Sequence, residues 1–246
     1  MPGTWTQEWI GGKPADVFQP ADTPKPRFGL LHLHHAGLGT LSEQPVFVRW
    51  LDHFRLACIC PRGGMSWWAD RLCPSFDPHI TPERHLLQHV LPHFEVRWGL
   101  RPGAVGLHGI GMGGQGALRL AFKYPRLFPA VAAISSAIDY HEWYGRGFVL
   151  DAMYDSKEEC RQDTALLHVH PTEFPTHIFF CCDPTDLNWY RGNDRLHEKL
   201  TALGIPHQCD LKTEAGGHSW QYFNHMAERS IRFLVEGLLQ ESRRLL

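Results

Sequence analysis

Residues 107–118 read Leu107-His108-Gly109-Ile110-Gly111-Met112-Gly113-Gly114-Gln115-Gly116-Ala117-Leu118, and this stretch decides the fold. An apolar run precedes it, as expected of a buried strand, and a helix-prone run follows. Gly109 and Gly113 stand two positions either side of Gly111, where a sharp strand-to-helix turn tolerates only small residues. That turn, G-x-S-x-G, normally presents a nucleophilic serine, and here Gly111 holds the serine position. We therefore predict the turn that normally carries a nucleophilic serine, with no nucleophilic side chain at its centre.

Two other interpretations of the glycine-rich turn are open. It can be a turn without chemistry, or a dinucleotide-binding loop, because Gly109, Gly111 and Gly114 match G-x-G-x-x-G. Against the dinucleotide loop, a long stretch of strand-forming chain precedes the turn. In addition, no acidic residue ends a strand about 20 residues later, where a ribose would need it.

Apolar runs alternate with helical patterns from residue 28 onward, which predicts an α/β fold with a mostly parallel sheet of about eight strands. An antiparallel hairpin is expected before them. Ligands should bind at the carboxyl ends of the parallel strands. The expected strands are Thr4–Ile10, Ala15–Gln19, Phe28–His34, Leu56–Cys60, Ala104–His108, Pro129–Ser135, Thr176–Cys182 and His207–Leu211. The expected helices are Ser42–Phe54, Pro82–Trp98, Gly113–Tyr124, Asn193–Leu203 and Trp220–Leu239.

Two segments downstream of the turn carry candidate partners for a nucleophile. Asp183 and Asp186 follow one expected strand, and His218 follows the last, within Gly217-His218-Ser219-Trp220. This is the chain order nucleophile, acid, histidine in which strand-turn-helix hydrolases place their triads. We predict Asp186 as the acid, with Asp183 as the alternative, and His218 as the base.

The chain resembles the esterase D-like family of α/β-hydrolases, which includes S-formylglutathione hydrolases and feruloyl or acetyl esterase domains. The resemblance spans about residues 28 to 240. It implies an α/β-hydrolase fold and carboxylic-ester hydrolysis. The matching residues are Gly109-Ile110-Gly111-Met112-Gly113-Gly114-Gln115-Gly116-Ala117, Tyr124-Pro125, Phe128-Pro129-Ala130-Val131 and Gly217-His218-Ser219-Trp220.

The sequence departs from this family at two places. Gly111 stands where the family has serine, so no acyl-enzyme can form by the usual route. The oxyanion loop reads His34-His35-Ala36-Gly37-Leu38-Gly39, without the glycine that usually follows its histidine. We expect the backbone N–H groups of Met112 and Ala36 to form the oxyanion hole.

These features favour an esterase scaffold that is inactive or weakly active, whether Gly111 arose naturally or by deliberate replacement. The alternative is a non-catalytic protein that binds a small molecule in the same pocket. The expected partner is a small-molecule ester or acyl ligand. Ser66, Trp67 and Trp68 follow a strand end and are candidates for the pocket wall, although packing beneath a long loop would also account for them.

We expect no cofactor and no metal. His85, His89 and His93 recur at helical spacing, but Pro92 disturbs the last turn and no carboxylate or cysteine stands at ligand spacing beside them. The formal net charge of −2 and the absence of a basic stripe argue against nucleic-acid binding.

The 246 residues suit one domain over 1–246, with a helical excursion at about 139–170. No run approaches the roughly 20 apolar residues of a membrane helix, and no signal peptide is visible. The seven cysteines show no disulfide framework, which suggests reduced thiols and a cytoplasmic protein. A homo-oligomer is compatible with the sequence.

Overall fold

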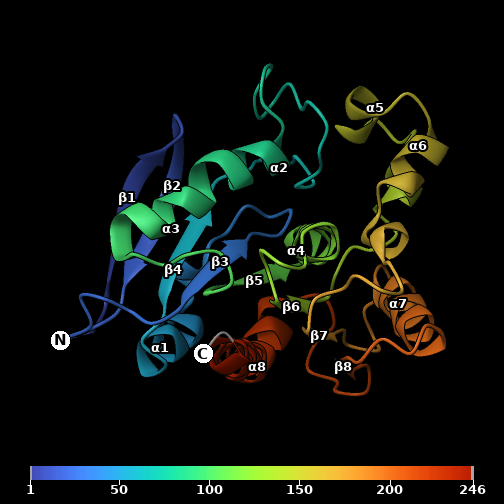
Figure 1. Cartoon of the computed structure of the whole chain (residues 1–246). Helices are drawn as coiled ribbons and strands as arrows, with labels where there is room; N and C mark the ends of the chain where they lie inside the picture. The colour runs from blue at the N-terminus through green and yellow to red at the C-terminus, as the bar shows by residue number, and fades with distance from the viewer. Residues whose placement is uncertain (1, 245–246) are drawn as a thin grey trace.

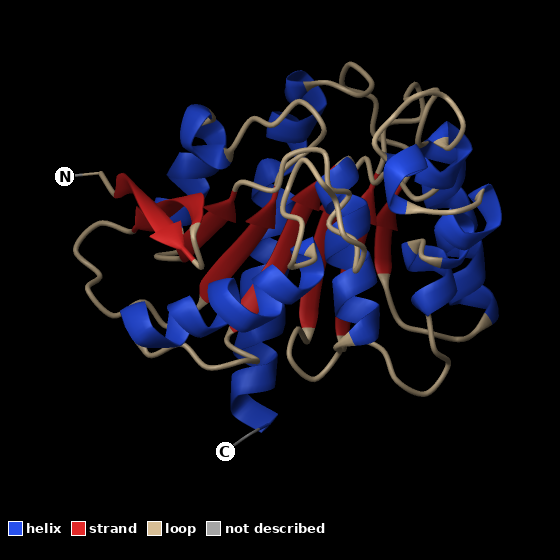
Figure 2. Cartoon of the chain, turned by 90° about the horizontal axis from the view of Figure 1, so that it is seen from above, coloured by secondary structure: helices blue, strands red, loops and turns tan. Residues whose placement is uncertain are grey.

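Within residues 2–244, which the computed structural model describes, eight strands pair in the order β1-β2-β4-β3-β5-β6-β7-β8. Figure 2 shows them side by side as one layer between helices. The antiparallel pairs are β1 with β2 and β2 with β4, and all other pairs are parallel. The predicted α/β fold is confirmed. The strands are β1 (Thr4–Ile10), β2 (Lys13–Gln19), β3 (Gly29–Leu33), β4 (Ala57–Pro61), β5 (Val105–Ile110), β6 (Ala130–Ile134), β7 (His177–Cys181) and β8 (Gln208–Asp210).

Helices cover both faces of this sheet. In Figure 1, α3 and α4 lie above the sheet, and α1 and α8 lie below it. Each face has its own apolar core, because β3, β5 and β6 are buried along their whole length and send side chains to both sides. The α-helices are α1 (Pro45–His53), α2 (Pro82–His85), α3 (Leu91–Trp98), α4 (Met112–Lys123), α5 (Leu150–Met153), α6 (Lys157–Gln162), α7 (Tyr190–Ala202) and α8 (Trp220–Arg244).

The helix expected over Pro82–Trp98 is interrupted. Thr81 caps its start, since the Thr81 hydroxyl accepts a hydrogen bond from the Arg84 backbone N–H at 3.2 Å. Residues Leu86–Val90 then form a π-helical turn, η2, before α3 begins. Pro92 lies just inside α3 and has no N–H to donate to the preceding turn, which accounts for the wider turn at this point.

Residues 139–170 contain four short helical segments, and in Figure 1 the two α-helices among them, α5 and α6, lie above α7 at the same side of the view. Two are α5 and α6, and two are 3₁₀ turns, η3 (Tyr140–Trp143) and η4 (Ala165–His168); a further 3₁₀ turn, η1 (Leu41–Glu43), precedes α1. None of the described helices combines the length and apolar character needed to cross a membrane.

Candidate active site

The turn from β5 into α4, predicted to be a nucleophile elbow, is sharp and has a positive φ at its centre. Gly111 lies between the two elements with φ 55° and ψ −115°, a conformation that strains any residue with a Cβ. Its N–H donates to the carbonyl oxygen of Ile134 at 2.9 Å. Its carbonyl oxygen accepts from the N–H groups of Gln115 (3.1 Å) and Ala137 (2.9 Å). The position of residue 111 is therefore fixed by β6 and by α4 at once.

The glycines on either side of the elbow are required by close backbone contacts. A Cβ on Gly109 would lie 2.1 Å from the carbonyl oxygen of Gly113, and a Cβ on Gly113 would lie 1.9 Å from the carbonyl oxygen of Leu33. Neither distance is possible between real atoms, and both obstacles are backbone. The first turn of α4 thus sits directly against β5 and the end of β3.

His218 and Asp186 form the predicted pair. The Nδ1–H of His218 donates to Oδ2 of Asp186 at 2.8 Å, because a carboxylate can only accept. Asp186 is buried, and its Oδ1 accepts from the N–H groups of Asn188 and Trp189, both at 3.1 Å. The His218 side chain retains 30 % exposure, so its Nε2 edge remains reachable from solvent.

Asp183, the alternative acid, has a different set of partners. Its Oδ2 accepts from the N–H groups of Ala215 (2.7 Å) and Gly217 (2.9 Å), and its Oδ1 accepts from Thr185. Burial raises the pKa of Asp183, but these hydrogen bonds outweigh it and lower the pKa to about 2. Asp183 therefore ties the loop of the acid to the loop of His218 and positions the histidine indirectly.

The vacant position at residue 111 faces His218. A Cβ built on Gly111 would lie 3.3 Å from Cε1 and 3.4 Å from Nε2 of His218, and 3.4 Å from Cβ of His35. A short side chain at residue 111 would need only small adjustments of its neighbours. The structure thus brings the three predicted residues Gly111, His218 and Asp186 together.

The two predicted oxyanion donors lie on separate elements. Met112 is the first residue of α4, and N–H groups in the first turn of a helix have no acceptor within the helix. In the loop after β3, the N–H of Gly37 donates to Nδ1 of His35 (2.9 Å) and that of Leu38 donates to the carbonyl oxygen of His35 (3.0 Å). No hydrogen-bond acceptor is recorded for the N–H of Ala36 among the described residues, so it is one of the unpaired donors of this loop.

His34 holds the oxyanion loop in place. Its Nε2 accepts from the N–H of Gly63 at 3.0 Å, so its Nδ1 carries the proton and donates to the carbonyl oxygen of His35 at 2.8 Å. Burial lowers the pKa of His34 to about 4. This neutral ring joins the loop after β3 to the loop after β4.

His35 was not among the predicted site residues, yet it borders the vacancy beside Gly111. Its ring packs edge-on against Trp220 (centroids 5.2 Å apart) and lies near Phe223. Burial lowers the pKa of His35, and the nearby His218 lowers it further, which favours the neutral ring. The doublet His34-His35 was the available signal, but it did not indicate which ring would face the elbow.

The proposed pocket wall is buried. Trp67 and Trp68 are each 1 % exposed, and Ser66 is fully buried. Trp67 stacks on Tyr140 at 4.9 Å between centroids, and Nε1 of Trp68 donates to the carbonyl oxygen of His34 at 3.3 Å. A ligand could touch these rings only if their neighbours moved. In this structure Trp68 packs against His34 in the loop after β3, and Trp67 packs against Tyr140 and Trp143.

Cys182 does not replace the missing nucleophile. Its Sγ lies 3.7 Å from Oδ2 of Asp186, so a sulfur atom does stand beside the acid. Burial and the charge of Asp186 raise the pKa of the Cys182 thiol well above its usual range. A buried neutral thiol is a poor nucleophile.

The histidines of the α2–α3 region do not gather as ligands. The rings of His85 and His89 are neighbours, with centroids 5.4 Å apart, whereas Nε2 of His93 pairs with Glu8 of β1 at 3.1 Å. Burial lowers the pKa of His85 to about 4. These rings pack against the N-terminal hairpin.

Comparison with known proteins places this chain in a family. Three solved structures each align with 96 % of this chain at a TM-score of 0.77. They are FphF, a fluorophosphonate-binding serine hydrolase of Staphylococcus aureus (18 % identity, 99 % of that chain covered), a ferulic acid esterase (15 %, 100 %) and an S-formylglutathione hydrolase of Agrobacterium tumefaciens (13 %, 94 %). At these identities the likeness establishes the fold. No curated protein matches the chain. The model of the family described as "Putative esterase" matches residues 83–232, so the chain belongs to that esterase family.

Proposed function

We propose that this chain is a carboxylic-ester hydrolase scaffold whose nucleophile position is empty, so that it hydrolyses its ester or acyl ligand slowly or not at all. One observation carries the proposal. A Cβ on Gly111 would lie 3.4 Å from Nε2 of His218, whose Nδ1 is held by Asp186 at 2.8 Å. The proposed base His218 and acid Asp186 therefore lie next to residue 111, which has no hydroxyl.

Slow hydrolysis can proceed through water instead of serine. Nε2 of His218 would take a proton from a water molecule, and Asp186 would stabilise the resulting imidazolium. The water oxygen would attack the ester carbon, and the N–H groups of Met112 and Ala36 would stabilise the oxyanion. Collapse of the intermediate expels the alcohol, which receives its proton from His218. An incomplete triad of this kind retains roughly 10³–10⁴-fold acceleration over water.

The second candidate is a binding protein that uses the same pocket without turnover. It is favoured by the same absence of a hydroxyl at Gly111. The two candidates separate in the unmodified chain. Slow hydrolysis of p-nitrophenyl acetate that disappears in His218→Ala supports the water route. Hydrolysis equal to buffer in both proteins supports binding alone.

Restoring the nucleophile tests the scaffold itself. Gly111→Ser should fold with a cost of about 1–3 kcal/mol from strain at φ 55° and should hydrolyse short p-nitrophenyl esters far faster than the parent. Gly111→Ala is the matched control, because it adds the Cβ and the strain without the hydroxyl. Gly111→Ser combined with His218→Ala should lose the gain. A folded Gly111→Ser with no activity above Gly111→Ala would contradict the proposal.

A further inference from the structure

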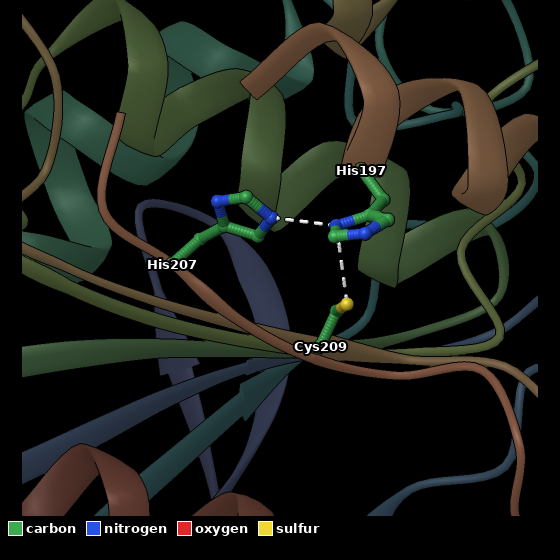
Figure 3. Close-up of side chains that lie close together, drawn as sticks. All are labelled: His197, His207 and Cys209. Carbon is green, nitrogen blue, oxygen red and sulfur yellow. Dashed lines mark hydrogen bonds between the residues drawn. The ribbon is translucent and has the colours of Figure 1, made fainter. Parts of the chain in front are cut away.

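Three side chains with metal-binding atoms converge at the edge of the sheet, on elements that the proposed esterase site does not use (Figure 3). His197 comes from α7, His207 immediately precedes β8, and Cys209 lies in β8. Nδ1 of His197 is 2.8 Å from Nε2 of His207 and 3.3 Å from Sγ of Cys209. Every pair among the three ligand atoms is within 4.8 Å.

The backbone sets the tautomer of His207. Its Nδ1 lies 2.8 Å from the carbonyl oxygen of Ile205, which can only accept, so Nδ1 carries the proton and Nε2 has a free lone pair. That lone pair faces Nδ1 of His197. In the metal-free protein, a proton on Nδ1 of His197 can be donated to Nε2 of His207, with Sγ of Cys209 also nearby. A backbone carbonyl behind the ring is also a common second-shell partner of a metal-binding histidine.

An ion can reach the cluster from outside. A surface cavity of about 470 Å³ is lined by His197 and Cys209, together with Tyr190, Asp194 and Arg229. Cys209 is the partly exposed cysteine of the chain, whereas the other six are buried. Asp194 precedes His197 by three residues on α7, which places both side chains on one face of the helix. A carboxylate is thus available beside the open side of the cluster.

We propose that His197, His207 and Cys209 bind one zinc ion, with a fourth position that opens to the cavity within reach of Asp194. Two imidazoles and a thiolate are preferred zinc ligands. Zinc–nitrogen and zinc–sulfur bonds of about 2.0–2.3 Å require tetrahedral ligand atoms to stand roughly 3.3–3.6 Å apart. The observed 2.8 Å and 3.3 Å require these two pairs to move apart by up to about half an ångström, and the third pair, Nε2 of His207 and Sγ of Cys209, lies within 4.8 Å.

Binding has a simple proton balance. The Cys209 thiol gives its proton to solvent and binds as thiolate. His197 loses the proton on Nδ1 and regains one on Nε2, so its charge does not change. One proton is released for each zinc ion bound.

Zinc at this place would join α7 to β8. The β8 strand pairs with β7 over only three residues and is the last strand of the sheet. The chain continues from β8 into the loop that carries His218. The ion would therefore hold this short edge strand against a helix. This role is independent of the proposed esterase function.

The test uses the full chain, stripped with a chelator and reconstituted with Zn²⁺ or Co²⁺. We expect one ion per chain, a thiolate-to-cobalt charge-transfer absorption, and a rise in Tm with zinc. Zinc should also protect Cys209 from alkylation by iodoacetamide. A parent chain that retains no zinc, or whose cobalt form lacks the thiolate absorption, would overturn the proposal without any variant.

Variants then locate the site. Loss of a second-shell partner alone costs about 10–100-fold in metal affinity, so Cys209→Ser and His207→Gln should each weaken zinc binding by roughly 100-fold or more. His225→Gln, an exposed histidine on α8, is the matched control and should bind zinc as the parent does. If Cys209→Ser combined with His207→Gln still binds one zinc with parental affinity, the ion lies elsewhere and the assignment is wrong.

Discussion

At the elbow, His218 donates its Nδ1–H to the carboxylate of Asp186, whereas at the sheet edge His207 donates its Nδ1–H to the carbonyl oxygen of Ile205. Both bonds are 2.8 Å long, and both fix which nitrogen of the ring is free. The acceptors of the two bonds differ in charge, since one is a carboxylate and the other a carbonyl oxygen. A carboxylate stabilises an imidazolium, which a proton-accepting histidine must become, while a carbonyl mainly fixes the tautomer and leaves a neutral lone pair.

The comparison indicates what each region lacks. The elbow has a base that can take up a proton but no hydroxyl at Gly111 to supply it. The edge has three donor atoms within 4.8 Å of one another and no charged partner hydrogen-bonded to His207 among the described residues. We therefore propose proton transfer for the first region and metal coordination for the second, although both are built on a histidine with one anchored nitrogen.

We expect the largest effect from removing the charge of Asp186, the carboxylate bonded to His218. In a Gly111→Ser background, Asp186→Asn should lower kcat by about 10⁴-fold, because the amide cannot stabilise the imidazolium and can hold the wrong tautomer. The measurement is kcat with p-nitrophenyl acetate. Asp155→Asn, the same change at an exposed carboxylate, is the control and should leave kcat unchanged. If Asp186→Asn kept a tenth of the activity, the proton-transfer role assigned to the pair would be wrong.

The next effect concerns the rigidity of the elbow. Gly113→Ala should destabilise the fold by about 3 kcal/mol or more, since its Cβ would meet the carbonyl oxygen of Leu33 at 1.9 Å and neither backbone can yield. Gly106→Ala on β5 is the control. Its Cβ would meet the end of the Leu234 side chain at 3.3 Å, which can move, and we expect a cost below about 1 kcal/mol. Urea denaturation of both variants measures the difference, and equal costs would contradict this view of the elbow.

The sequence was most informative where chain order determines spatial order. In a parallel sheet the carboxyl ends of the strands meet at one edge, so the sequence alone predicts that the turn at Gly111, the loop at Asp186 and the loop at His218 lie together. The choice between Asp183 and Asp186 needed the structure. Only two residues separate them, and the bend of the loop turns Asp186 toward His218 while Asp183 turns to the backbone of Ala215.

Features that depend on helix rotation and side-chain packing were not predictable. His197 meets His207 and Cys209 only because α7 packs over β8 with one particular face. No spacing in the sequence records that contact. The burial of Trp67 and Trp68 was equally unpredictable from the sequence. Both residues have positive φ angles, 56° and 54°, and both rings lie in the core. No sequence pattern indicates positive φ at a tryptophan.

A smaller effect should appear in the pH dependence of stability. Hydrogen bonds lower the pKa of Asp183 to about 2 in the folded protein, against an unfolded value of about 3.9. The carboxylate therefore stabilises the fold above about pH 4, and this contribution is lost as pH falls through 2. Urea midpoints of the parent and Asp183→Asn should differ at pH 6 and converge toward pH 2. A constant difference across that range would show that the charge of Asp183 does not hold the two loops together.

The smallest effect should come from Cys209→Ser in the metal-free protein. There the thiol makes one weak contact with Nδ1 of His197 at 3.3 Å, and a hydroxyl can replace it, so the cost should stay near 0.5–1 kcal/mol, the order of one neutral hydrogen bond. Urea denaturation in the presence of a chelator measures this value. The difference from the parent should then grow when zinc is added, because only the parent gains the energy of coordination. A cost of about 3 kcal/mol or more without metal would mean that the Cys209 sulfur contributes mainly to packing at the edge strand. Only His197 and His207 would then remain as evidence that this region binds a metal.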